Sequence, residues 1–285
     1  MPDNKTDNDI YDEIEKTGQL DDKDINLGAT ALLMSSIYHP DVSLMNYHVH
    51  LDQLVVGTKA RFDDLVKEGS PDDNATRLAA LKYALIEQNS YKGDMETAKD
   101  IANGDIIAVI DRRKGLPTTI GLLFIHVCRV LGWEIEALSF PANLILRLKK
   151  ESDLLIFDPF NDCRVLQASD LRALLKTAHG DHAELSSNFY APLSNKALLT
   201  GIFNFLKLKQ IEAGDYDTAT KTVEMLMRLD PKEYRLYLDA GVLYSRTGRP
   251  QDAIQILEKY LDTSPSNRDR QEAAILIQRI KQSLN

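Results

Sequence analysis

The chain contains little of what stabilises small secreted proteins or membrane proteins. Among its 285 residues only two are cysteine, Cys128 and Cys163, and one is tryptophan. Two thiols cannot build a disulfide framework or a cysteine-rich zinc site, which is typical of a protein from a reducing cytoplasm. No apolar run approaches the ~20 residues that are needed to cross a bilayer. The N-terminus is acidic and polar, so we expect no signal peptide.

The chain also lacks an excess of basic residues. Its net charge is -9, and the first 30 residues alone carry nine Asp or Glu against three Lys or Arg. We expect residues 1–24 to be a solvated, mostly disordered acidic arm with a short amphipathic turn at Ile10, Tyr11 and Ile14. Nucleic acids are bound through phosphate neutralisation by Lys and Arg, so we expect no nucleic-acid partner. We also expect no membrane association and no cofactor.

The last third of the chain repeats itself with a constant period of 34 residues. The residues that recur are Gly214 at Gly248, Ala219 at Ala253, and Asp230-Pro231 at Ser264-Pro265. This period resembles that of tetratricopeptide repeats, whose helix pairs stack because a single pair cannot bury its own apolar face. The resemblance implies a role in binding other proteins or peptides.

The two copies do not match the residue pattern of the repeat equally well. In the second copy, Gly241 is a small residue where two helices approach closely. The first copy is weaker, because Lys207 stands where a small residue is expected. A last segment over 268–284 has the helical spacing of the capping helix that such arrays need. We therefore expect an all-α tetratricopeptide domain of two repeats and a capping helix over 193–285.

The resemblance also implies where a partner would bind. In this repeat type the first helix of each pair lines the concave face, which would hold an extended peptide or a helix. The residues expected to form this groove are Asn204, Leu208, Ile211, Arg235, Leu238, Val242 and Arg246. The groove could instead be filled by the chain's own core or by its acidic arm, and the oligomeric state is left open.

The region between the arm and the repeats changes its periodicity midway. Apolar residues first recur at helical spacing, and the segment from Thr118 to Leu131 is apolar on nearly every side, which indicates a helix buried all round. After Gly132 the pattern alternates like that of strands. The expected strands cover 134–138, 143–149 and 154–158. Helices followed by a small antiparallel sheet predict an α+β domain over 25–192, with the buried helix against the sheet.

Four segments of this region, taken in order, resemble the transglutaminase-like core of the bacterial SirB-type proteins. They are RKGLPTTI at 113–120, RVLG at 129–132, FPANLILR at 140–147 and FDPFN at 157–161. Those proteins are similar in layout too, with a helical N-terminal part, this core and C-terminal tetratricopeptide repeats. The core is a distant relative of papain-like cysteine proteases.

The resemblance implies three positions for a catalytic site. Enzymes of that superfamily place a Cys at the start of the buried helix, a His on the next strands and an Asp on the strand after. Here the equivalent positions hold Thr118, Asn143 and Asp158. An amide cannot accept a proton at neutral pH, so Asn143 cannot act as the general base. We expect a non-catalytic interaction or scaffold protein.

The alternative is a cryptic cysteine or threonine peptidase or acyl-transferase that uses Cys163, or Thr118 with Thr119. We favour packed, unreactive thiols at Cys128 and Cys163. We also expect the Asp158 carboxylate to form a structural pair, with Arg147 or with Asn143, rather than to bind a ligand.

Two other charged segments have a functional and a structural interpretation. The residues His179, Asp181 and His182 have a spacing that could hold a metal weakly, but a solvated loop is favoured. The basic turn Arg112-Arg113-Lys114 could present charge to an anionic partner. Cations at a helix C-terminus are the favoured interpretation of that turn.

Overall fold

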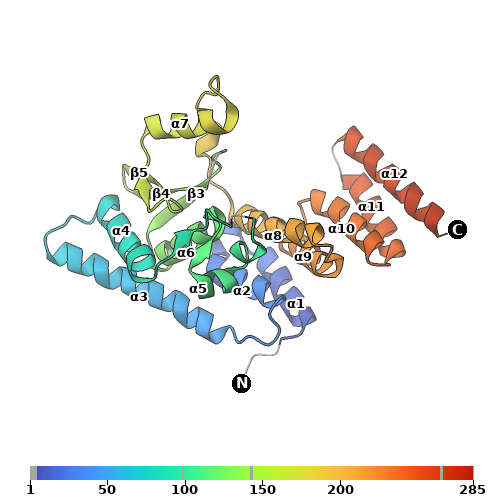
Figure 1. The fold of residues 1–285 in the computed structure, drawn as a ribbon, viewed down its shortest axis with the longest axis horizontal. Helices are drawn as coiled ribbons and strands as arrows, with labels where there is room; N and C mark the ends of the chain where they lie inside the picture. The colour runs from blue at the N-terminus through green and yellow to red at the C-terminus, as the bar shows by residue number, and fades with distance from the viewer. Residues whose placement is uncertain (1–4, 98, 142–143, 264–265, 285) are drawn as a thin grey trace. The chain divides into compact units, whose positions relative to one another are not determined.

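The computed structural model describes residues 5–97, 99–141, 144–263 and 266–284 (Figure 1). The chain folds as two compact units, and each combines segments that are distant in sequence. Within the described residues, unit 1 consists of Asp22–Ser36 and Asp41–Ile202, and unit 2 of Lys5–Asp21, Ile37–Pro40 and Phe203–Asn285. The domain limits that we expect from the sequence remain predictions.

Unit 1 begins with helices whose ends carry local capping groups. They are α2 (Leu27–Ser36), α3 (Met45–Lys67) and α4 (Asn74–Leu81), with a 3-10 turn at Asp22–Asp24 and a π-helical segment at Lys82–Gln88. The Asp73 side chain accepts a hydrogen bond from the Thr76 amide and so caps α4.

A short crossover leads into the buried helix. Strand β1 (Lys92–Gly93) pairs in parallel with β2 (Lys114–Gly115), and α5 (Ile106–Arg112) lies between them in sequence, after a 3-10 turn at Ile101–Asn103. Helix α6 (Pro117–Val130) follows β2 directly. Ten of its fourteen residues are buried, as the apolar sequence predicted. Gly132 follows α6 with φ +70°, a conformation that glycine adopts without strain.

The sheet of unit 1 is antiparallel and has the order β3-β4-β5-β6. Its strands are β3 (Glu134–Leu138), β4 (Ile145–Lys150), β5 (Asp153–Asp158) and β6 (Arg164–Val165). Helix α6 covers one face, where the ring centroids of Phe124 and Phe157 lie 5.8 Å apart. Helix α7 (Ala168–His179) covers the other face through Leu171 and Leu175, which share an apolar cluster with Ile145. A 3-10 turn at Ser187–Tyr190 extends this cover.

The α+β fold class that we predicted is therefore confirmed. Figure 1 shows α6 and α7 on opposite sides of the strands. Both faces of the sheet are covered, so the small sheet can hold apolar side chains on either side of its backbone.

Unit 2 is all-helical and carries the repeats. Its helices are the end of α8 (Asn195–Glu212), α9 (Tyr216–Leu229), α10 (Arg235–Arg246), α11 (Pro250–Thr263) and α12 (Asn267–Ser283). Gly214 and Gly248 have φ values of +77° and +74° and occupy equivalent turns of the two copies. Ser264 and Pro265 lie outside the described residues.

The structure explains why the two copies differ at one position. In copy two a Cβ atom on Gly241 would lie 2.4 Å from Cγ of Leu257, so only glycine fits there. In copy one the equivalent residues are Lys207 and the shorter Val223. The Lys207 ammonium is buried and donates to Asn204 Oδ1 at 2.8 Å and to the carboxylate of Asp239. The lysine thus replaces close helix packing with a polar link between α8 and α10.

Residues 7–18 of the acidic arm form a helix, whereas we expected a mostly disordered segment. Helix α1 (Asp7–Gly18) begins with a capping box between Thr6 and Asp9 and packs on α9. Its buried residues are Ile10, Tyr11 and Ile14. Three apolar residues cannot hold a short helix in water by themselves. The partner surface on α9 supplies the missing stability, and nothing local in the sequence revealed that surface.

Polar contacts also hold α1 against α9. The guanidinium carbon of Arg228 lies 4.2 Å from the ring centroid of Tyr11, a cation–π contact. The hydroxyl of Tyr11 donates to Glu224 at 3.3 Å, and Lys221 pairs with Asp7 at 2.7 Å. The acidic segment therefore lies against α9. Residues 7–18 therefore do not occupy the groove that we expect on α8 and α10. The possibility that this part of the acidic arm fills the groove is removed.

The close approach of α1 to α9 leads to a stability prediction. A Cβ atom on Gly18 would lie 2.4 Å from the carbonyl oxygen of Arg228 and 2.7 Å from that of Leu229. Backbone atoms cannot turn aside, so Gly18→Ala should destabilise unit 2 by about 1–3 kcal/mol. Thermal unfolding followed by circular dichroism measures this loss.

The matched control is Gly201→Ala in α8, where an added Cβ would have no atom within 4 Å. There the helix propensity of alanine should stabilise the protein by about 0.5–1 kcal/mol. Equal melting temperatures for the two variants would contradict the packing described for α1.

Candidate functional site

The N-terminus of α6, where the superfamily carries its nucleophile, is closed by packing. Thr119 is fully buried, and its hydroxyl donates to the carbonyl oxygens of Asn103 at 2.8 Å and Leu116 at 3.1 Å. Thr118 beside it is half-buried. No described side chain is placed to remove a proton from the Thr119 hydroxyl, because both of its partners are main-chain acceptors.

The second position, Asn143, lies outside the described residues. The next described residue, Leu144, packs on α6: a Cβ atom on Gly121 of α6 would meet Cδ2 of Leu144 at 2.4 Å. The small residue at position 121 permits this close approach of the segment that leads into β4.

The third position, Asp158, is buried at the end of β5 and holds its own loop. Its Oδ1 accepts hydrogen bonds from the amides of Phe160 at 2.9 Å and Asn161 at 3.3 Å. Its Oδ2 accepts a further bond from the side-chain amide of Asn161 at 2.5 Å. These three bonds make the carboxylate an anchor of the loop that leads from β5 to β6.

The predicted pair between Arg147 and Asp158 is wrong. Arg147 on β4 stands directly opposite Glu136 on β3, and its Nε donates to Glu136 Oε2 at 2.8 Å. Cross-strand neighbours of opposite charge are the nearest partners that a sheet offers. Lys149 forms ion pairs with Glu134 and with the same Glu136. Asp158 is left to bond with its own loop.

The sheet also directs Asp158 away from α6. Side chains alternate between the faces of a strand, and Phe157 packs on Phe124 of α6. Asp158 accordingly lies on the α7 side, where it lines a cavity of about 300 Å³ with Asp170, Leu174 and other residues of α7.

Both cysteines are free and buried. Burial raises the pKa of the Cys128 thiol and of the Cys163 thiol, so little of either is thiolate at neutral pH. Lys82 opposes this effect at Cys163, while Asp162 adds to it. The environment of Cys163 is that of a packed side chain.

We predict slow alkylation of both thiols. In the native protein at neutral pH, iodoacetamide should modify Cys163 much more slowly than it modifies free glutathione, and Cys128 should react only in denaturant. The reason is that the thiolate is the nucleophile and both thiols are buried and protonated. Mass spectrometry of timed samples measures the rates. Rapid native labelling of Cys163 would instead support the acyl-transfer alternative.

Other charged candidates have structural roles in the described residues. Arg112 pairs with Asp94 and Asp100, and Arg113 ends α5 in a left-handed conformation, with φ +60°. The structural interpretation of the basic turn is therefore supported. In the described part of the chain, no three His, Cys, Asp or Glu side chains are close enough together to hold a metal ion.

A polar cluster that the sequence did not reveal joins α3 to the crossover. Arg113 donates to the hydroxyl of Tyr91 at 2.5 Å and contacts Nε2 of His50, which also lies 2.8 Å from that hydroxyl. Burial, together with the Arg113 charge, lowers the pKa of His50 to about 4, so this imidazole is neutral at pH 7. The three residues are far apart in sequence, and no local pattern connects them.

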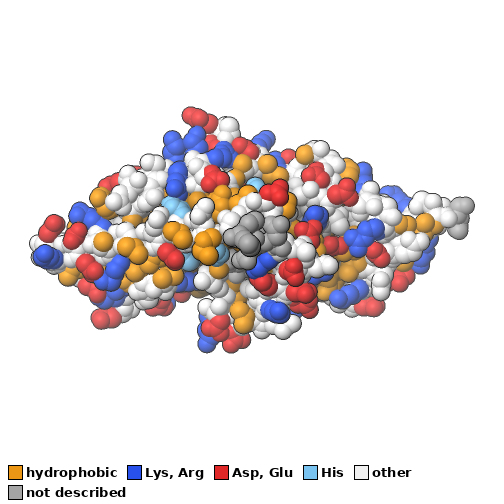
Figure 2. All heavy atoms as spheres, turned by 90° about the horizontal axis from the view of Figure 1, so that it is seen from below, with side chains coloured by type: hydrophobic (Ala, Val, Ile, Leu, Met, Phe, Trp, Pro, Cys, Tyr) orange, Lys and Arg blue, Asp and Glu red, His pale blue; other side chains and the backbone are white. Residues whose placement is uncertain are grey.

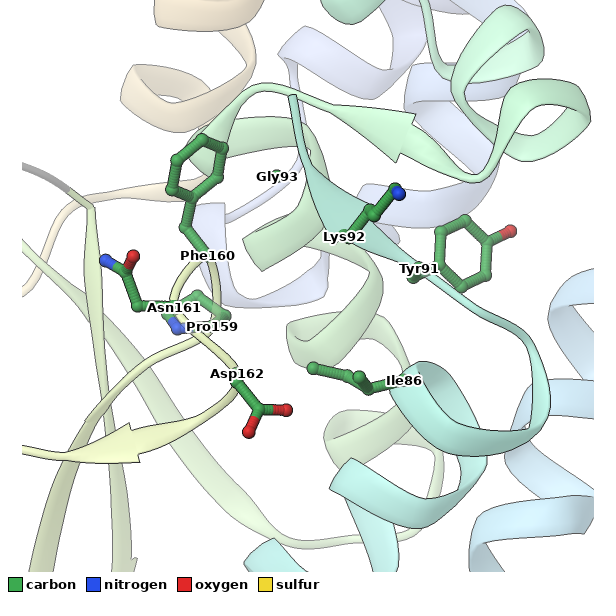
Figure 3. A pocket seen from close by; sticks show the side chains of 8 residues that line it. All are labelled: Ile86, Tyr91, Lys92, Gly93, Pro159, Phe160, Asn161 and Asp162. Atoms are coloured by element: carbon green, nitrogen blue, oxygen red, sulfur yellow. The ribbon is translucent and has the colours of Figure 1, made fainter. Parts of the chain in front are cut away.

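A cavity of about 460 Å³ opens beside this cluster. It is bounded by the end of the π-helical segment, by β1 and by the loop that Asp158 anchors (Figure 3). Its lining residues are Ile86, Tyr91, Lys92, Gly93, Pro159, Phe160, Asn161 and Asp162. None of these residues was a candidate in the sequence, because the cavity exists only where two distant segments meet.

The architecture now defines a class: a transglutaminase-like α+β unit combined with tetratricopeptide helices. The sequence profile of the transglutaminase-like superfamily matches residues 45–204, and that of the tetratricopeptide repeat matches residues 206–278. The first match covers more than half of the chain. The protein belongs to the transglutaminase-like superfamily.

Similar full-length relatives occur in bacteria. A UPF0162 protein of Xylella fastidiosa (strain Temecula1) is 25% identical over 250 residues, which cover 87% of either chain. A UPF0162 protein of Vibrio cholerae is 24% identical and covers 83% of this chain and 86% of its own. The F-box only protein 21 of Mus musculus is 25% identical over 65% of this chain and 30% of its own.

No solved structure matches the chain. Among the described residues, none of the helices combines the length and the apolar character needed to cross a bilayer.

The anchoring role of Asp158 can be tested by substitution. Asp158→Ala leaves two partly buried amides without their acceptor, so the free energy of unfolding should fall by about 1–2 kcal/mol, and Asp158→Asn should lose less. Urea unfolding measures the change. The control is Asp162→Asn in the same loop, whose exposed pair with Lys82 should contribute about 0–1 kcal/mol. Unchanged stability of Asp158→Ala would show that the carboxylate is not a structural anchor.

Proposed function

We propose that the protein is a non-catalytic interaction protein, whose repeat helices hold a partner peptide and whose transglutaminase-like unit is a degenerate relative of enzymes. One observation carries this proposal. Leu208 on α8 and Val242 on α10 are exposed apolar residues at equivalent positions of the two copies, with 56% and 40% of their surface accessible. Single exposed apolar residues are ordinary, but two in register on linked helices form a row.

The neighbouring side chains fit a peptide groove. Lys207 and Asp239 join α8 to α10, so the residues one helical turn away on either side share this face. The groove that we propose keeps the residues expected from the sequence: Asn204, Leu208, Ile211, Arg235, Leu238, Val242 and Arg246. Arg235 and Arg246 add positive charge at exposed positions, which favours an acidic partner.

The loss of catalysis is supported by two of the three positions of the superfamily site, the first and the third. Thr119 is buried and bonded to main-chain oxygens, no thiol lies in the first turn of α6, and Asp158 anchors a loop on the far face of the sheet. A general base needs to reach the proton that it removes. No contact among the described residues favours the peptidase or acyl-transferase alternative.

Three finer assignments belong to the same proposal. The order of the four core motifs supports placing the chain among the SirB-type proteins. The two free thiols support a cytoplasmic location. Figure 2 shows Lys and Arg side chains interspersed with Asp and Glu on the face in view, which supports a partner other than nucleic acid.

The groove is tested by removing its apolar row. The double variant Leu208→Ser/Val242→Ser should lose about tenfold or more in affinity for the partner captured by the parent protein, since two apolar anchors are lost. Quantitative affinity capture from native extract, followed by titration with the purified partner, measures the loss. The control is Val130→Ser, an equally exposed apolar residue at the end of α6.

A second variant tests the charge of the partner. Reversal of Arg235 and Arg246 to Glu should weaken binding of an acidic partner and leave the melting temperature nearly unchanged, because exposed charges contribute little to folding. If either double variant unfolds the protein, the face is an internal interface and the groove is abandoned.

A further inference from the structure

The outer face of α3 carries accessible apolar side chains. The helix has 23 residues and buries Leu51, Leu54 and Thr58 against unit 1. Four apolar residues on the remaining face are accessible: Met45 (67%), Val49 (45%), Val56 (67%) and Val66 (40%). Figure 2 views unit 1 from the side of α3 and shows hydrophobic side chains at its surface. The solvent face of a surface helix is normally polar, so this apolar row indicates a contact surface.

The accessible apolar residues belong to a heptad pattern. Two lines of residues run along this face with a spacing of seven, and the second line is offset from the first by four. The lines are Met45, Asp52, Lys59 and Val66, and Val49, Val56 and Asp63. Alternating steps of four and three residues form the seam along which one helix packs on another in a coiled coil. The pattern therefore predicts a second helix as the occupant of this face.

The charges within the seam indicate which helix fits. Asp52 and Lys59 are both exposed and lie four residues before and three residues after Val56. A second copy of α3 in parallel register would set Asp52 against Asp52 and Lys59 against Lys59, which repel each other. An antiparallel copy centred beside Val56 sets Asp52 against Lys59 at two places. Met45 and Val66, eleven and ten residues from Val56, then meet each other at both ends.

The antiparallel arrangement also accommodates the third charged residue of the seam. Val49 and Asp63 each lie seven residues from Val56, so they come opposite each other. The Asp63 carboxylate accepts a hydrogen bond at 2.7 Å from Lys59 on its own helix. It can keep this bond at the edge of the pair, where both side chains remain accessible to water.

We propose that α3 pairs with α3 of a second copy of this chain, antiparallel, about a two-fold axis beside Val56. A two-fold interface uses the same patch on both copies, so every contact occurs twice. The apolar residues supply attraction, and the two pairs of Asp52 with Lys59 fix direction and register, as polar residues in a helical seam do. The surface lies on unit 1, apart from the repeat helices, and goes beyond the proposed function.

Sedimentation equilibrium of the full chain over a range of concentrations tests this association. The average mass should rise from that of one chain, 32.1 kDa, toward that of two. Val56→Glu sets two carboxylates against each other beside the axis, so it should weaken association by about tenfold or more. The matched control is Val130→Glu, an exposed valine at the end of α6, which should associate like the parent. Circular dichroism checks that both variants keep their helix content.

Charge exchange tests the direction of the pair. Asp52→Lys and Lys59→Asp should each weaken association by about fivefold or more, because each sets like charges together at two places. The double variant Asp52→Lys/Lys59→Asp should restore the parent affinity, since lysine again meets aspartate. In a parallel pair, neither single variant would differ from the parent in this way.

Cysteine cross-linking locates the axis. Under mild oxidation Val56→Cys should form a disulfide between two copies, because the two residues meet beside the axis. Val66→Cys should form none, because its two copies lie ten residues from the axis on opposite sides, roughly 30 Å apart at the usual helical rise. The native cysteines are buried, so the parent protein serves as the blank.

Four results would overturn the proposal. The mass of a single chain at every concentration would exclude a second copy and leave the face to a helix of another protein. Unchanged association of Val56→Glu would place the contact on another surface. Failure of the double charge variant to recover, or cross-linking through Val66→Cys, would exclude the antiparallel arrangement. None of these results depends on the repeat groove, whose test uses α8 and α10.

Discussion

The burial of α6 is the constraint on which the arrangement of unit 1 depends. A helix with ten of its fourteen residues buried has to be packed on every side along most of its length, and small residues make the closest approaches possible. Gly121 receives Leu144 from the start of β4, and Phe124 meets Phe157 of β5. The first turn of α6 is tied to the crossover by Thr119. The strands, the crossover and the loop after β5 take their positions from these contacts.

The position that provides the catalytic carboxylate in related enzymes has a different use here. Asp158 is buried and accepts three hydrogen bonds from the loop that follows it. A buried carboxylate in such a position stabilises the loop, because its removal leaves partly buried donors unpaired. The loop in turn holds Phe160 against Gly93. The residue at the position that the resemblance identifies as catalytic therefore shapes, through its loop, the cavity beside β1.

Unit 2 shows how a repeat array can be completed from a distant part of the chain. Helix α1 packs on α9, although unit 1 intervenes between them in sequence. The end of a helical array exposes an apolar face that needs a cover. Asp9, Asp12 and Glu15 of α1 are exposed, while Ile10 and Ile14 are buried. The sequence of α1 is that of a solvent-exposed segment, yet the helix is part of the packed fold.

The sequence by itself determined the secondary structure of the core and of the repeats. The apolar run of α6, the alternation of β3 to β5 and the 34-residue period are local signals, and each element follows from its own residues. The choice of partners was decided only by the tertiary structure. Arg147 pairs with Glu136 because the strand register places them opposite each other. The acidic arm is helical because α9 covers it, and the cavity exists because β1 meets the loop after β5. These features depend on which distant segments come into contact, and a single sequence holds no local pattern that records such contacts.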